Sequence, residues 1–363
     1  MIDWDSWPVF DLRSGEKKAK LSTALAALTR HHYERCSPYR AILEARNALA
    51  SLDAGLEAIP FLPVGLFKFE ELLSIPKEQV AKVVTSSGTT SQQVSRVFLD
   101  RDTAASQARA LVMILQDFIG KDRSPMMIVD HPSVIRDKTS FSARAAGILG
   151  ISNFGRSHRY LLRDADMSLD LDVLNDFLES HKGRPKLMFG FTFMVWRYLY
   201  QELRRIGHRP DLSDVTLIHS GGWKKLQDVA VGNRDFKAAL AEWTGMRRVH
   251  NFYGMAEQVG SVFVECEQGV LHTPAYADVL VRDPFSWRVS PKGQRGLIQV
   301  LSVLPESYPG HSLLTEDLGE ILGEDDCPCG RLGKTFVVHG RLARAEVRGC
   351  GDTHASIAAA VTS

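Results

Sequence analysis

The strongest chemical signal in the sequence is a run of hydroxyl side chains, TSSGTTS, at residues 85–91. Six of its seven residues carry a hydroxyl group, and its single glycine permits a tight backbone turn. The apolar segment AKVV leads directly into the run, as a strand leads into a loop that binds phosphate through hydroxyls and backbone amides. A flexible surface linker could have this composition too, and no Gly-Lys-Ser/Thr follows, so this is not a Walker A loop. The residues predicted to contact phosphate are Thr85, Ser86, Ser87, Gly88, Thr89 and Thr90.

Three cysteines and one histidine supply the ligand types of a structural zinc site. Cys266 and His272 lie six residues apart on a predicted hairpin, and Cys327 and Cys329 follow in the segment CPCG. Three thiolates and one imidazole complete a tetrahedral zinc shell. The Cys-x-Cys spacing is less specific than Cys-x-x-Cys, so these residues could also be unconnected.

Two further positions are candidates for contact with a substrate. His131 directly follows the apolar strand MMIVD, and strand ends in α/β folds face the ligand crevice. Phe191 lies among Phe189, Phe193 and Trp196 and could line an apolar pocket. The alternatives are a structural hydrogen-bonded histidine and ordinary core aromatics.

A second motif, NFYGMAE at residues 251–257, indicates a protein family when it is taken together with the hydroxyl run. TSSGTTS resembles the phosphate loop of the adenylate-forming superfamily, and NFYGMAE resembles its Tyr-Gly-x-Thr-Glu motif. The resemblance implies that Tyr253, followed by Gly254, stacks on adenine and that Glu257 reaches the magnesium held by ATP phosphates. Two departures are visible: the lysine that usually closes the phosphate loop is missing, with Arg96 the nearest cation, and Ala256 replaces threonine. Taken alone, Tyr253 could be a core residue and Glu257 a helix-capping acid.

Three weaker motifs, one before NFYGMAE and two after it, complete the order typical of the superfamily. HSGGW at 219–223 looks like the adenine loop and contains Gly221 and Gly222. LTED at 314–317 looks like the motif whose aspartate, here Asp317, binds the ribose hydroxyls, and Gly340-Arg341 resembles the hinge, where Arg341 also meets ribose or phosphate. The resemblance covers roughly residues 60–350.

The end of the chain indicates one branch of this superfamily. Only 22 residues follow Arg341, too few for the usual small C-terminal domain. The ending RLARAEVRGCG is similar to that of the acyl-protein synthetases of the bacterial luminescence fatty-acid reductase complex. These are related to phenylacetate-CoA ligases, which the segments around Cys266, His272 and CPCGR also resemble and some of which hold zinc there. This implies that Cys350 accepts the acyl group from the adenylate and passes it to a partner such as an acyl reductase. A thiolate suits that step, and nearby arginines would lower its pKa.

Other outcomes stay open at this level. The acyl group could go to coenzyme A or a carrier protein, or the chain could bind a nucleotide without turnover. The identity and chain length of the acid, and the oligomeric state, are not encoded in these motifs.

Composition excludes several classes of protein. Lys plus Arg number 44 against 43 acidic residues, so no strong field favours nucleic acid or membrane. The acidic start has no signal-peptide pattern, and five cysteines without framework spacing fit a reducing compartment. We expect a cytoplasmic protein.

The apolar periodicity predicts an α/β fold with largely parallel strands. Predicted strands at 126–130, 187–191, 215–220 and 247–254 alternate with helices at 100–119, 170–181, 193–207 and 225–243. A helical region is expected at 17–50, broken at Pro38, with a short helix near 70–73. The predicted organisation is a large adenylate-forming domain at 1–338, followed by a hinge remnant and tail at 339–363. The large domain divides into a helical region at 1–80, an α/β core at 81–258 and a smaller β-rich part at 259–338.

Overall fold

The computed structural model describes residues 2–86, 94–135, 143–223 and 230–342, and these residues form two compact units. The first unit comprises Met1–Ile114, Gly254–Phe263 and Val270–Ser363. The second comprises Leu115–Tyr253 and Val264–Gly269.

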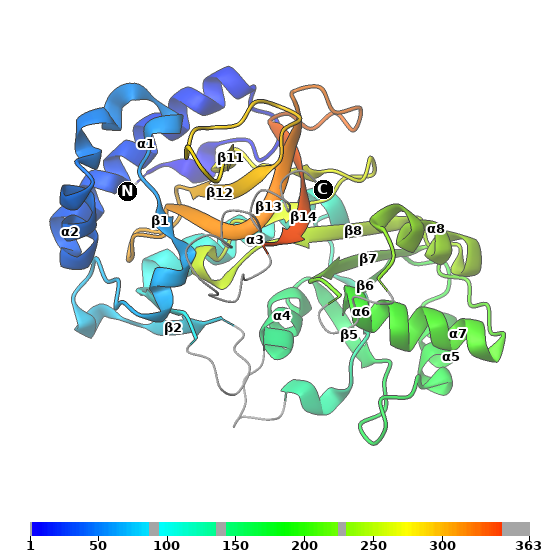
Figure 1. Cartoon of the computed structure of the whole chain (residues 1–363). Helices are drawn as coiled ribbons and strands as arrows, with labels where there is room; N and C mark the ends of the chain where they lie inside the picture. Colours follow the sequence, from blue (N-terminus) through cyan, green and yellow to red (C-terminus); the bar gives the residue numbers. More distant parts are fainter. Residues whose placement is uncertain (1, 87–93, 136–142, 224–229, 343–363) are drawn as a thin grey trace, which may run out of the picture. The chain divides into compact units, whose positions relative to one another are not determined.

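The second unit is built on a parallel sheet in the order β5-β4-β6-β7-β8, with the short β9 (Phe263–Val264) next to β8 (Figure 1). Central strands β6 and β7 are buried along almost their whole length, as expected for parallel strands covered on both faces. The strands are β4 Ser124–Ile128, β5 Gly155–Tyr160, β6 Lys186–Phe191, β7 Val215–Ser220 and β8 Arg248–Tyr253.

Helices cover one face of this sheet with a single apolar cluster. The cluster contains Met127, Met188 and Leu217, which are neighbours in register on β4, β6 and β7. Phe177, Leu199 and Leu240 of the helices pack in the same cluster. The chain segment after β6 continues without a break from α6 through a π-helical turn, η7, into α7. The helices of this unit are α4 Ala143–Ser152, α5 Leu171–Ser180, α6 Thr192–Met194, η7 Val195–Tyr200, α7 Gln201–Ile206 and α8 Asn233–Thr244, with the 3-10 turn η6 Pro132–Ile135.

The first unit contains an antiparallel sheet in the order β10-β14-β13-β12-β11, and β1 pairs with β13 (Figure 1). A separate two-stranded hairpin joins β2 to β3. The strands are β1 Leu62–Pro63, β2 Lys82–Thr85, β3 Arg96–Leu99, β10 Leu271–His272, β11 Ala277–Arg282, β12 Gly296–Ser302, β13 Ser312–Glu324 and β14 Lys334–Arg341.

Helix α1 (Ser14–Arg35) packs through one buried face that carries Leu21, Leu25, Leu28 and His32, at helical spacing. The buried ammonium of Lys17 fixes its first turn by donating to Thr273 Oγ1 at 2.7 Å. The other helices are α2 Ser37–Ala45 and α3 Arg101–Ile119, and the 3-10 turns are η1 Trp4–Ser6, η2 Ala48–Ala54, η3 Leu56–Ala58, η4 Val64–Lys68, η5 Lys77–Gln79 and η9 Ala256–Gln258.

The α/β prediction and the four predicted parallel strands are confirmed, as are the helices at 100–119, 170–181 and 193–207. The short helix expected near residues 70–73 is wrong: the turn is η4, where Phe67 is buried against Tyr308. The helix expected from 225 begins, within the described residues, at Asn233. The first helix ends at Arg35, before Pro38, because proline fits the first turn of α2, where a backbone N–H needs no partner.

Candidate active site

The second unit brings predicted nucleotide-binding residues to the carboxyl ends of neighbouring strands. Ser220 is the register partner of Phe191 on one side and of Phe252 on the other. Gly221 and Gly222 follow β7, and Tyr253 ends β8. This edge of a parallel sheet is where α/β folds bind ligands.

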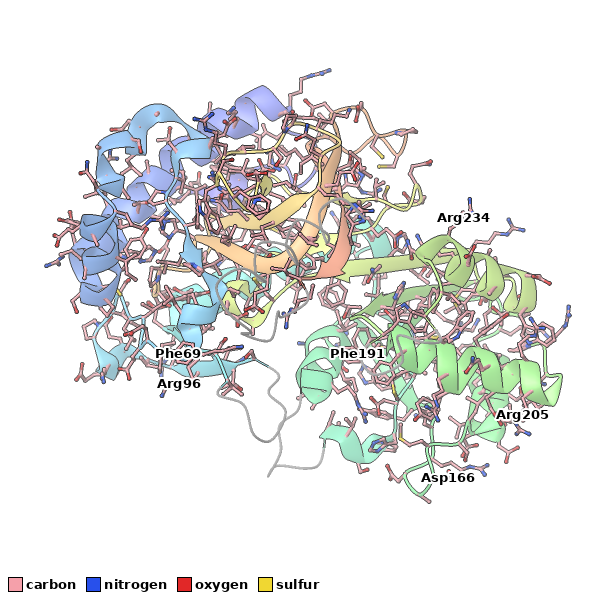
Figure 2. All side chains as sticks on the ribbon, viewed as in Figure 1. Phe69, Arg96, Asp166, Phe191, Arg205 and Arg234 are labelled. Carbon is pink, nitrogen blue, oxygen red and sulfur yellow. The ribbon has the colours of Figure 1, made fainter. Side chains whose placement is uncertain are left out.

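The ring of Phe191 packs closely against two glycines, Gly221 and Gly147. A Cβ atom at Gly221 would lie 3.1 Å from Phe191 Cδ1, and one at Gly147 would lie 3.1 Å from its Cζ. Gly221 also has φ +81°, which disfavours any side chain. The ring, labelled in Figure 2, therefore lies beside the predicted adenine loop.

His219, one residue before that loop, is a structural group. It is buried, its Nδ1 lies 2.9 Å from Thr192 Oγ1, and its ring packs 4.9 Å from that of Phe236. Burial lowers its pKa to about 3, so it stays neutral at physiological pH.

His131, predicted to contact the substrate, belongs to a polar network at the end of β4. Its Nδ1 lies 2.7 Å from Ser133 Oγ and 3.1 Å from Asp164 Oδ1, and its Nε2 lies 3.1 Å from an Arg144 nitrogen. A guanidinium only donates hydrogen bonds, so Nε2 accepts and the proton sits on Nδ1. Arg144 in turn pairs with the buried Asp130 at 2.9 Å.

Two carboxylates in this network have opposite pKa shifts. A hydrogen bond from Ser133, the largest effect, lowers the pKa of Asp164, whereas burial raises that of Asp130 despite Arg144. Sequence reasoning missed Arg144 and Asp164, because neither belongs to a motif and Asp164 is 33 residues from His131.

In the first unit, the predicted phosphate loop begins where β2 ends, and β2 pairs with β3. Thr85 pairs with Arg96, and Ser86 exchanges two bonds with Ser95: its N–H donates to Ser95 O at 3.2 Å and its Oγ accepts from Ser95 N at 3.0 Å. These bonds close the base of the loop. Ser87, Gly88, Thr89 and Thr90 lie outside the described residues.

Gly254 and Glu257 come directly after β8, in the segment that includes η9. Glu257 is only 7% exposed, and the next residue, Gln258, is also buried. A predicted ligand of magnesium is thus carried on a packed turn and not on a free loop.

The aspartate and arginine motifs meet across two strands. Asp317 of β13 is the register partner of Arg341 of β14, with Arg341 Nε 3.6 Å from Asp317 Oδ1. Glu316 lies 3.9 Å from the same nitrogen. The Arg341 side chain is 67% exposed, so this pairing contributes little stability and leaves the guanidinium accessible to a ligand.

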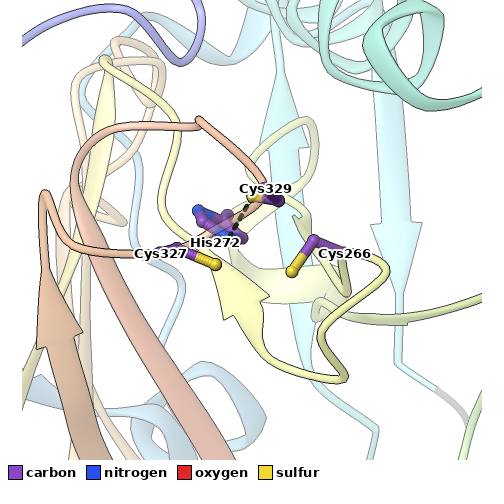
Figure 3. Close-up of side chains that lie close together, drawn as sticks. All are labelled: Cys266, His272, Cys327 and Cys329. Atoms are coloured by element: carbon purple, nitrogen blue, oxygen red, sulfur yellow. Dashed lines mark hydrogen bonds between the residues drawn. The ribbon is translucent and has the colours of Figure 1, made fainter.

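The four predicted zinc ligands converge (Figure 3). Their ligand atoms all lie within 4.8 Å of one another, and Cys329 Sγ is 3.3 Å from His272 Nε2. Cys266 and His272 are fully buried, whereas Cys327 and Cys329 are half-buried. Zinc–sulfur and zinc–nitrogen bonds of about 2.0–2.3 Å suit a cluster of this size, so the residues fit a closed structural site.

Glu265, next to Cys266, is a supporting residue that the sequence did not reveal. Its buried carboxylate accepts hydrogen bonds from Lys237 Nζ at 2.9 Å and from the backbone N–H of Asn251 at 3.1 Å, and also from the Asn233 side chain. Its backbone N–H donates to Asn251 O at 2.8 Å. Glu265 thereby fixes the segment that carries Cys266 against β8.

Cys350, predicted to accept the acyl group, lies outside the described residues. Among those described, Cys36 is a free thiol, but burial raises its pKa and makes it a poor nucleophile. None of the described helices has the length and apolar character needed to cross a bilayer.

Comparison with known proteins adds a family and a fold. Residues 4–358 match the family model described as "Acyl-protein synthetase, LuxE". Two curated relatives, from Vibrio harveyi and Aliivibrio fischeri, are each named a long-chain-fatty-acid–luciferin-component ligase. The first is 22% identical over 92% of this chain and 87% of its own length, and the second 22% identical over 90% and 85%. Among solved structures, a 2-hydroxyisobutyryl-CoA ligase with bound 2-HIB-AMP superposes with a TM-score of 0.70 at 19% identity, covering 92% of this chain and 69% of that one. At that identity the likeness shows a shared fold.

Proposed function

The chain belongs to the acyl-protein synthetase family LuxE, and from that membership we propose that it converts a long-chain fatty acid into an acyl-adenylate and then transfers the acyl group to a thiol. The match over residues 4–358 carries this proposal. The substrate class is the one in the names of both curated relatives.

We assign nucleotide contacts to both units. In the second unit, Tyr253 stacks on adenine beside Gly221 and Gly222. In the first, Asp317 and Arg341 contact ribose, while Gly254 and the hydroxyl loop that begins at Thr85 and Ser86 surround the phosphates. The strand ends, the closed base of the hairpin and the exposed guanidinium support these roles.

Glu257 is the proposed magnesium ligand. Bound magnesium would neutralise phosphate charge during the displacement. The chain's contribution is to hold a carboxylate on a packed turn, so that little reorganisation is needed when ATP binds.

The fatty acid is proposed to bind near His131, Arg144 and Phe191. Arg144 provides guanidinium donors for a carboxylate, His131 orients that guanidinium by accepting from it at Nε2, and Phe191 provides apolar surface. One carboxylate oxygen attacks the α-phosphorus of ATP, pyrophosphate leaves, and the acyl-adenylate forms. The Cys350 thiolate then attacks the acyl carbon and AMP leaves, which produces a thioester for a partner such as an acyl reductase.

Zinc is proposed at Cys266, His272, Cys327 and Cys329 as a structural ion. All four positions are already close together, and thiolate ligands need reduced cysteines. A reducing compartment, the cytoplasm, is therefore the proposed location.

The experiment is ATP–pyrophosphate exchange with a series of fatty acids. We expect exchange that depends on the acid, and Glu257→Gln should reduce it by at least about 10-fold at fixed magnesium. No exchange with any aliphatic or aryl acid would refute the proposal.

A further inference from the structure

One loop of the first unit, residues 305–311 (the 305–311 loop), holds the turn that carries Glu257. The Tyr308 hydroxyl donates to the main-chain carbonyl of Glu257 at 3.0 Å. Two residues further along the loop, the carbonyl of Gly310 accepts from Gln258 Nε2 at 2.9 Å. The last two residues of this short 3-10 turn, Ala256–Gln258, are therefore tied to the same loop.

Tyr308 is fully buried, and its hydroxyl has a second fixed partner. Gln107 Nε2, on α3, donates to that hydroxyl at 3.2 Å. The hydroxyl thus accepts once and donates once, which leaves its proton directed at the Glu257 carbonyl. Burial raises the pKa of the Tyr308 phenol, so the group keeps that proton at any pH at which the protein works.

The loop has little freedom to move. A Cβ atom at Gly310 would lie 2.2 Å from Tyr308 Cε2, so the chain folds back over the ring as only glycine allows. The Gly310 N–H closes this fold on Tyr308 O at 2.7 Å. Phe67 packs edge-on against the tyrosine ring, with centroids 6.0 Å apart.

The same loop is also fixed to the strand that leaves the phosphate loop. Ser307 Oγ donates to the carbonyl of Phe98, in β3, at 2.9 Å. Ser307 O accepts from the Ser74 N–H at 2.8 Å. Adjacent residues of one loop, Ser307 and Tyr308, therefore hold β3 and the Glu257 turn.

We propose that Tyr308 is a positioning residue, which sets the place of the Glu257 carboxylate relative to the β2–β3 phosphate hairpin and so determines how well magnesium–ATP is held. This inference rests on the proposed role of Glu257. Without the Tyr308 hydroxyl, a buried carbonyl and the Gln107 amide would each lose a partner, and the turn would relax while the ring kept its packing.

The test is Tyr308→Phe, read both as the magnesium concentration for half-maximal pyrophosphate exchange and as the dissociation constant of magnesium–ATP, measured by calorimetry without fatty acid. We expect both values to rise by about 10-fold, within the range seen when a residue that orients a metal ligand is removed, with the KM for the fatty acid unchanged. Gln258→Met removes the second tie with little change in volume and should shift the magnesium dependence in the same direction.

Tyr276→Phe is the matched control. Tyr276 is also fully buried in the first unit, and its hydroxyl donates to a single backbone carbonyl, that of Ala110, at 2.9 Å. It should lower the melting temperature by a few degrees, as Tyr308→Phe does, but leave the magnesium dependence at the wild-type value.

These variants test the positioning role of Tyr308 separately from the magnesium-binding role of Glu257. If Glu257→Gln shifts the magnesium dependence but Tyr308→Phe shifts it no more than Tyr276→Phe, the positioning role is refuted and the role of Glu257 stands. If Glu257→Gln has no effect on it, both the magnesium assignment and the positioning built on it are wrong, whereas acid-dependent exchange would still support adenylation.

Discussion

Two fully buried histidines in the first unit should make its stability fall in mild acid. The rings of His32 and His311 stack with centroids 4.9 Å apart and an angle of 26°. His311 Nε2 lies 2.9 Å from Thr29 Oγ1, whose own proton goes to Leu25 O, so Nε2 carries the hydrogen. His311 Nδ1 has no hydrogen-bond partner among the described residues, and a second proton there would be buried without an acceptor.

The surroundings of the pair disfavour positive charge. His32 donates from Nε2 to Pro305 O at 3.1 Å and its Nδ1 lies 2.7 Å from Ser74 Oγ. His31 and Arg35 lie nearby on α1, and the Tyr39 hydroxyl is 3.4 Å from His311 Nε2. Burial, the largest effect, lowers the pKa of His311 to about 3 and that of His32 well below its usual value.

Because the pKa of His311 is lowered in the native state, the stability of the first unit decreases as the pH falls. The unfolded chain, in which His311 titrates near 6.5, takes up a proton that the native state refuses, so stability is complete above pH 6.5 and is lost as the pH falls towards about 3. At pH 5 the loss from His311 alone is about 2 kcal/mol, from one and a half pH units at about 1.36 kcal/mol each. His32 should add to it.

The decrease in unfolding free energy can be measured by native-state hydrogen exchange of peptides from α1, corrected for intrinsic exchange rates. This measurement is local, so it does not require the two units to unfold together. His311→Gln keeps a donor for Thr29 but cannot titrate. It should be less stable at pH 8, yet lose about 2 kcal/mol less than wild type between pH 8 and pH 5. An equal loss in both proteins would refute the argument, and acid release of a metal cannot mimic the difference because both proteins keep the four metal ligands.

Three further predictions concern the site. Purified protein should contain about one zinc per chain, and chelation should lower the melting temperature; elemental analysis that finds no metal in protein prepared without chelators would rule the site out. Glu265→Gln should weaken zinc affinity by about 10-fold in competition with a chromogenic chelator, because the support of Cys266 loses its charge, while Glu267→Gln serves as the neighbouring control. Cys350→Ser should retain pyrophosphate exchange but lose hydroxylamine-sensitive acyl labelling. If the variant is labelled as well as wild type, the acceptor is another residue. If wild type is not labelled but forms acyl-CoA, the protein is a ligase that uses coenzyme A.

The sequence predicted the parts of the fold that local periodicity determines. Buried strands such as β6 and β7 show as continuous apolar runs, and α3 shows as an amphipathic helix, because each pattern lies within one element. The proximity of Cys266, His272, Cys327 and Cys329 could be predicted from residue type and spacing, since three cysteines and a histidine are a common ligand set for zinc.

The supporting residues could not be predicted, because their partners are distant in sequence and are common residue types. Tyr308 lies 51 residues from Glu257 and 201 from Gln107, and His32 lies 273 from Pro305. A tyrosine or glutamate outside a motif carries no sign of the carbonyl or amide it will contact. The wrong helix near residues 70–73 has a similar cause: burial of Phe67 against Tyr308, a tertiary contact, decides where the turn forms.

The 305–311 loop connects the buried histidines with the proposed magnesium ligand. Pro305 O accepts from His32, Glu306 O lies 3.0 Å from His31 Nε2, and Tyr308 holds Glu257. The loop folds tightly through Gly310 and is bonded to β3 by Ser307. Because the loop is held in this way, we expect a shift of Pro305 and Glu306, which contact the histidines, to move Tyr308 as well. We therefore expect protonation of the histidines that contact this loop to disturb the turn that carries Glu257. Through these contacts we expect α1, although remote in sequence, to influence the proposed role of Glu257.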